Sequence, residues 1–182
     1  MAIKDQMLRV LRSPDTQRIR FSFNGTTGAK ISVDGSSFRR VAAAIENDTI
    51  HPNEGGVARG WAQYDARTNN FNIGPGEHWS RAFDALLIHE SVHAAFDLNH
   101  STLPWIDNET AAYVAQGYYL RNSGFGNARL DHLGQPYLGR MIVDSIVRGE
   151  GAEGFWLDQL HDSLLSSPQY HSYIRGTFTG DG

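Results

Sequence analysis

The chain of 182 residues contains no cysteine. Disulfide bonds are therefore excluded, and a metal site in this chain has to be built from histidine and carboxylate rather than from thiolate ligands. The absence of cysteine does not fix the cellular compartment, because a chain without thiols tolerates either redox environment.

The N-terminal stretch, residues 1–18, lacks a long apolar run. Signal peptides and membrane anchors both require such a run. We therefore expect a protein that is synthesised in the cytoplasm without a signal peptide and has no membrane partner. Export by a specialised secretion system stays compatible with this sequence, as does use as a module of a larger chain.

Basic residues are too few to form an obvious patch. The 16 lysines and arginines are outnumbered by 20 aspartates and glutamates, which gives a net charge of −4. We therefore expect no nucleic-acid partner. The composition, with 40% hydrophobic and 20% charged residues, is that of an ordinary globular protein. The length predicts a single domain over 1–182, with a helix in 1–15 and a tail at 176–182 as peripheral parts.

Against these absences stands one pattern that carries chemistry, the HExxH motif His89-Glu90-Ser91-Val92-His93. On a helix, the two histidines lie one turn apart on the same face, and Glu90 lies about 100° round the axis at the border of that face. This spacing suits a zinc ion, because two imidazoles can bind the metal while the adjacent carboxylate handles the proton of a water molecule.

The residues around the motif predict an unusual helix. Most of the segment 84–97 is apolar, while the two histidines, Glu90 and Asp97 share one sector of the helical wheel. A polar stripe on an apolar helix indicates burial on most sides. Two buried imidazoles and a carboxylate need partners, and a metal ion would supply one. The alternative is a buried helix whose histidines are hydrogen-bonded and bind no metal.

The order of the predicted elements, strands first and helices afterwards, favours an α+β fold. In chain order we expect a helix over 3–11, a hairpin of strands 19–23 and 30–33, a helix from 36 or 37 to 45, a loop over 51–60, a second hairpin of strands 61–65 and 71–73, the motif helix capped by Ser80, an irregular segment over 99–103, and helices over 107–122 (with Asp107 as its cap), 135–148 and 154–166.

A catalytic zinc site usually has three protein ligands, so a third ligand must come from outside the motif. The metzincin pattern would place a histidine six residues after His93, where this chain has Asn99. Glu109 lies near the start of the next predicted helix, and a short loop before that helix could place its side chain next to the two histidines. An acid in a first helical turn also offsets the helix dipole without any metal. The remaining candidates for the third ligand are Asp97, His100 and Asp107.

The motif followed by Asn108-Glu109 at a helix start resembles the thermolysin-like gluzincin zinc metallopeptidases. The resemblance covers residues 61 to about 120. It implies a zincin-like fold, in which a small, mostly antiparallel N-terminal sheet packs on the motif helix and further helices follow. It also implies Zn²⁺ bound by His89, His93 and Glu109, with Glu90 as general base. The compact size is similar to that of small bacterial metallopeptidase domains that act as effectors or toxins.

The chain departs from the gluzincin pattern at Tyr113, where that family has an aspartate that orients the first histidine. The resemblance then requires a carboxylate from elsewhere, and Asp97 and Asp107 are the candidates. Tyr113 lies one turn after Glu109 and is a candidate donor to the oxyanion of the reaction. It could equally be a core aromatic residue. Rival donors are His132 and Tyr137.

Together these features predict a zinc-dependent metallopeptidase that hydrolyses peptide bonds with zinc-activated water, in an effector or toxin. Its partner would be a peptide or protein substrate, and the sequence identifies no inhibitor or immunity protein. By the resemblance, 60–65 is a sheet edge that binds extended peptide. One alternative function is a zinc amidase acting on cell-wall peptides. The other is a non-catalytic zincin-like domain that binds a partner, although the intact Glu90 argues against it.

Overall fold

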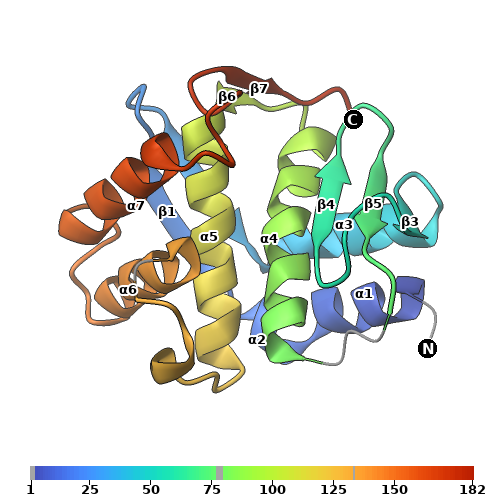
Figure 1. The fold of residues 1–182 in the computed structure, drawn as a ribbon, viewed down its shortest axis with the longest axis horizontal. Coiled ribbons are helices and arrows are strands. Elements are labelled where there is room, and N and C mark those ends of the chain that lie inside the picture. The colour runs from blue at the N-terminus through green and yellow to red at the C-terminus, as the bar shows by residue number, and fades with distance from the viewer. Residues whose placement is uncertain (1–2, 77–79, 133) are drawn as a thin grey trace.

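The computed structural model describes residues 3–76, 80–132 and 134–182 and has a mixed α+β architecture, as predicted (Figure 1). The α-helices of the described part are α1 (Ile3–Arg12), α2 (Pro14–Gln17), α3 (Gly35–Glu46), α4 (Arg81–Leu98), α5 (Trp105–Asn122), α6 (Gln135–Val147) and α7 (Phe155–Ser166). The strands are β1 (Arg20–Asn24), β2 (Lys30–Asp34), β3 (His51–Glu54), β4 (Ala62–Asp65), β5 (Asn70–Ile73), β6 (Thr102–Pro104) and β7 (Thr177–Thr179).

The strands of the described chain form three small sheets, so the prediction of one N-terminal sheet is wrong. The first sheet is the antiparallel hairpin β1–β2, and the third pairs β6 with β7. In the second sheet, ordered β3-β5-β4, strand β3 runs parallel and β4 antiparallel to the central β5. β3 lies where a loop was predicted. The prediction missed this strand because its sequence, HPNE, has no apolar alternation. Its proline is tolerated at the edge of a sheet.

Helices α4 and α5 lie side by side and antiparallel at the centre of the molecule (Figure 1). Ser80 caps α4 as predicted, since its side chain accepts the Phe83 N–H at 3.1 Å. Every residue of α5 from Ile106 to Leu120 is buried, and α4 is buried from Phe83 to Asp97 except at Leu86. Polar side chains on these two helices must therefore find partners inside the protein.

Helix α5 begins two residues earlier than predicted. Pro104 occupies the N-cap position and Asp107 lies within the first turn, so the prediction that Asp107 caps this helix is wrong. The Asp107 carboxylate instead accepts the backbone N–H and the hydroxyl of Thr26, each at 3.0 Å. This contact ties the loop between β1 and β2 to the start of α5.

The two ends of the described chain contact other elements of the protein. On α1, Met7 and Val10 are fully buried, and the Arg9 guanidinium forms an ion pair with Asp84 at 3.1 Å. The tail predicted at 176–182 contains β7, which pairs with β6 over three residues. The C-terminal segment, which comprises residues 167–182 after α7, therefore crosses the end of the α4–α5 pair (Figure 1).

No helix of the described residues is both long enough and apolar enough to span a bilayer.

The close packing of α5 on α6 gives a test of the fold. A Cβ atom on Gly117 would lie 2.7 Å from the backbone N of Arg140, which is too close for van der Waals contact. Alanine normally stabilises a helix interior, but here the clash should lower the free energy of unfolding by about 1–3 kcal/mol.

The matched control is Gly126→Ala, because a Cβ atom there meets nothing within 4 Å. Chemical denaturation of both variants measures the difference. Equal stability of Gly117→Ala and Gly126→Ala would contradict the packing of α5 on α6.

Candidate metal centre

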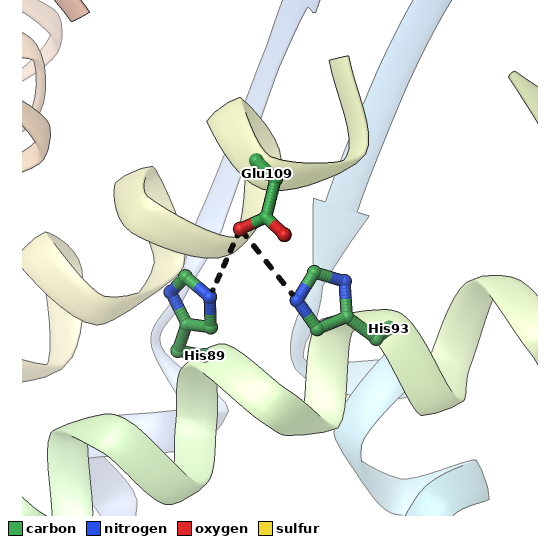
Figure 2. Close-up of side chains that lie close together, drawn as sticks. All are labelled: His89, His93 and Glu109. Carbon is green, nitrogen blue, oxygen red and sulfur yellow. Dashed lines mark ion pairs between the residues drawn. The ribbon is translucent and has the colours of Figure 1, made fainter. Parts of the chain in front are cut away.

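His89 and His93 on α4 and Glu109 on α5 point toward one another between the two helices (Figure 2). The Glu109 Oε2 atom lies 3.3 Å from His89 Nε2 and 3.8 Å from His93 Nε2. One donor atom from each of the three side chains lies within 4.8 Å of the other two, and all three residues are buried. This group could hold a metal ion.

Two of the three separations between donor atoms are close to those around a small tetrahedral cation. Donor atoms about 2.0–2.2 Å from such an ion lie roughly 3.3–3.6 Å apart, close to the two separations that Glu109 Oε2 makes with the histidines. The same oxygen is buried and has no hydrogen-bond partner in the described part of the chain. A cation between the three side chains would satisfy this atom and neutralise the buried carboxylate.

Neighbouring side chains hold two of the three groups in place. The Asn108 Oδ1 atom lies 2.7 Å from His93 Nδ1, so a proton on Nδ1 leaves Nε2 free to bind a metal. The Tyr173 hydroxyl donates to Glu109 Oε1 at 3.0 Å, which leaves Oε2 as the oxygen that faces the histidines. Burial alone would raise the pKa of Glu109, but the neighbouring histidines and the Tyr173 hydrogen bond lower it below its ordinary value.

His89 is held differently, and the prediction of a carboxylate partner for it is wrong. Its Nδ1 atom has no hydrogen-bond partner among the described residues, and the ring packs edge-on against Tyr113 with 4.4 Å between centroids. Asp97 accepts instead from the Tyr64 hydroxyl at 2.6 Å, and Asp107 is engaged by Thr26. Both acids lie near helix ends and face other elements, whereas the tyrosine ring fills the space beside His89.

The other candidates for the third ligand are not part of the group that the described residues form. Besides the Tyr64 hydroxyl, Asp97 accepts the backbone N–H of Asp181 at 2.9 Å. His100 is exposed at the end of α4, where its backbone adopts a left-handed conformation with φ 51°. The structure therefore brings Glu109, rather than Asp97, His100 or Asp107, to the two histidines.

Glu90 lies beside the candidate metal-binding group and is held by the second sheet. Its Oε2 atom accepts the backbone N–H of Tyr64 in β4 at 2.9 Å. Burial raises the pKa of Glu90 to about 7, although the nearby His93 and the Tyr64 N–H act in the opposite direction. The predicted segment 60–65 thus lies next to the motif helix, with β4 as an outer strand of its sheet.

A cleft of about 1120 Å³ opens over the group. Residues of α4 and α5 line it together with β4 and with residues of the C-terminal segment, among them Tyr170, Tyr173 and Phe178. The Tyr113 hydroxyl, predicted as an oxyanion donor, also lines the cleft and is hydrogen-bonded to the Tyr170 hydroxyl.

Sequence patterns gave no signal for Tyr170 and Tyr173. They lie 57 and 64 positions along the chain from Tyr113 and Glu109, their respective partners, and only the path of the C-terminal segment brings them to the cleft. The rival donors His132 and Tyr137 pack on each other with 4.7 Å between ring centroids and are not among the described residues that line the cleft.

Comparisons with protein-family models, with curated proteins and with solved structures each find no match to this chain.

The contact between Tyr173 and Glu109 predicts a measurable effect on metal binding. Tyr173→Phe removes the hydroxyl and leaves Oε1 of the buried carboxylate without its donor. The affinity for added Zn²⁺ should fall by about 10–100-fold, as is typical when a partner of a metal ligand is lost. Competition with a chelator of known affinity measures the change.

Tyr137→Phe makes the same chemical change at a residue that does not line the cleft, so its zinc affinity should equal that of the wild type. Equal affinities in all three proteins would show that Tyr173 does not support the centre.

Proposed function

We propose that this chain is a zinc-dependent hydrolase that cleaves peptide bonds with a gluzincin type of ligand set. The observation that carries the proposal is the convergence of His89 Nε2, His93 Nε2 and Glu109 Oε2 beneath a cleft that also contains a second carboxylate, Glu90. A structural metal site is normally closed by four protein ligands, whereas three ligands beside a cleft leave a position for water or substrate.

Zinc is the metal that best suits these donors. Two imidazole nitrogens and one carboxylate oxygen, with no thiolate, are the ligand set of many catalytic zinc sites. When bound, zinc would supply Lewis acidity that activates water and polarises a substrate carbonyl.

Glu90 is suited to proton transfer by its position. The Tyr64 N–H occupies Oε2 and fixes the orientation of the carboxylate, while Oε1 is the oxygen left to accept a proton from the attacking water. The same oxygen can then deliver the proton to the leaving nitrogen. A carboxylate in this role does not need to bind the metal, and Glu90 is not part of the group formed by the two histidines and Glu109.

The hydroxyl pair of Tyr113 and Tyr170 is suited to stabilise negative charge on the substrate oxygen. In a hydrogen bond between two phenols, one hydroxyl donates and the other accepts, so the accepting tyrosine keeps its own proton for a third group. Both residues line the cleft. Tyr113 was a candidate oxyanion donor from the sequence, and Tyr170 of the C-terminal segment would act together with it.

β4 offers an edge for an extended substrate. It is an outer strand of its sheet and lines the cleft from Ala62 to Asp65. Glu90 already uses one N–H of this strand, at Tyr64, so a bound peptide would pair with the edge groups on either side of it. Such pairing would bring a scissile bond over the motif helix.

The substitution Glu90→Gln tests the proposal, because the amide keeps the size of the side chain and an oxygen that can accept the Tyr64 N–H, but it cannot act as a base. Peptide hydrolysis by the zinc-loaded protein should fall by at least about 100-fold. Zinc content, measured by elemental analysis, should stay at the wild-type value. Hydrolysis that survived in Glu90→Gln would overturn the proposed role of this residue.

A further inference from the structure

The cleft continues along α5 beyond the candidate metal centre. Gln116 lies seven residues after Glu109 and three after Tyr113, so the three side chains share one face of the helix. The rise of the helix places Gln116 about 10 Å from Glu109 along the axis. Three more glutamines line the same cleft: Gln63 in β4, Gln135 at the start of α6 and Gln169 next to Tyr170.

Gln116 lines the cleft and is 7% exposed, and its amide oxygen, Oε1, has no hydrogen-bond partner among the described residues. By contrast, Asp107 accepts from Thr26, and the Thr110 hydroxyl donates to the Ile106 carbonyl. Because buried polar atoms in folded proteins are nearly always hydrogen-bonded, this oxygen calls for a donor, and a ligand bound in the cleft that Gln116 lines is a source of one.

The surroundings of Gln116 favour an uncharged ligand group. Apart from Glu90 and the candidate metal ligands, the charged residues among the described lining are Asp65 and Arg67. These two form an ion pair at 3.5 Å at the end of β4. The described lining from α5, α6 and residues 167–182 contains no charged side chain apart from Glu109, so a charged ligand group beside Gln116 would lack a close counter-charge. A carboxamide, by contrast, can both donate to and accept from a glutamine.

We propose that Gln116 recognises a neutral, hydrogen-bonding side chain of the substrate, either glutamine or asparagine. This inference rests on the proposed peptidase function. An extended peptide advances about 3.3 Å per residue, so the recognised side chain lies within roughly three residues of the scissile bond. The specificity of the enzyme at this subsite is for a carboxamide over an aliphatic or an acidic side chain.

The test uses the full, zinc-loaded chain and a set of internally quenched alanine peptides. One guest position is moved along the peptide and is occupied by glutamine, leucine or glutamate. At one guest position, wild-type kcat/KM should be at least about tenfold higher for glutamine than for either alternative, because an unpaired buried amide rejects a partner that lacks hydrogen-bonding groups. Gln116→Leu should abolish this preference.

A control variant separates recognition from a general structural effect. Gln159→Leu makes the same change at an exposed position of α7, outside the described lining of the cleft, and should keep the wild-type ratio of kcat/KM for the glutamine and leucine peptides. A merely structural effect of Gln116→Leu would lower kcat/KM for all three guest residues alike.

Binding of the same peptides to zinc-loaded Glu90→Gln distinguishes failure of the subsite from failure of the proposed function. Preferential binding of the glutamine peptide, without hydrolysis by the wild type, would support the subsite and overturn the peptidase function. Hydrolysis with a guest preference that Gln116→Leu leaves unchanged would overturn the subsite alone. Neither binding nor hydrolysis of any peptide would overturn both.

Discussion

The constraint on which the structure depends is the burial of polar side chains between two adjacent helices. Helices α4 and α5 are buried along most of their length, yet they carry aspartates, glutamates, histidines and asparagine. Water cannot solvate these groups, so each requires a partner from another part of the protein. The arrangement of the remaining elements around the helix pair follows largely from these requirements.

Three of the buried aspartates are satisfied by elements that surround the helix pair. α1 supplies Arg9 to Asp84, the loop after β1 supplies Thr26 to Asp107, and β4 supplies the Tyr64 hydroxyl to Asp97. These contacts fix the two helices relative to each other and to the sheets. What they leave at the centre is the group of two histidines and Glu109, which lacks sufficient partners of its own and therefore suits a cation.

The C-terminal segment contributes both to the packing of the fold and to the surroundings of the candidate metal centre. Pairing of β7 with β6 places Phe178 against Trp105, with 5.0 Å between their ring centroids. Earlier in the segment, Tyr173 reaches Glu109, and at its end the Asp181 N–H reaches Asp97. A segment that is far from the motif in sequence thus contacts both helices of the centre.

Sequence patterns predicted the elements whose signals are local. The motif helix has a long apolar pattern and a serine cap, so it could be predicted without the structure. Glu109 could be named as one of several candidate ligands, because Asn108-Glu109 opens the next helix as the gluzincin resemblance implies. Strands β3, β6 and β7 have three or four residues and no clear alternation, and tertiary pairing forms them. Tyr170 and Tyr173 could not be found for a related reason, since their role depends on the path of the C-terminal segment. The predicted carboxylate beside His89 failed because an aromatic ring fills that space.

The proposed binding of one zinc ion by the two histidines and Glu109 can be observed in crystals. Diffraction from zinc-loaded crystals at energies on both sides of the zinc absorption edge tests it directly. We expect one strong anomalous peak per chain, about 2.0–2.2 Å from His89 Nε2, His93 Nε2 and Glu109 Oε2. A peak at other residues, or the absence of any peak between α4 and α5, would contradict it.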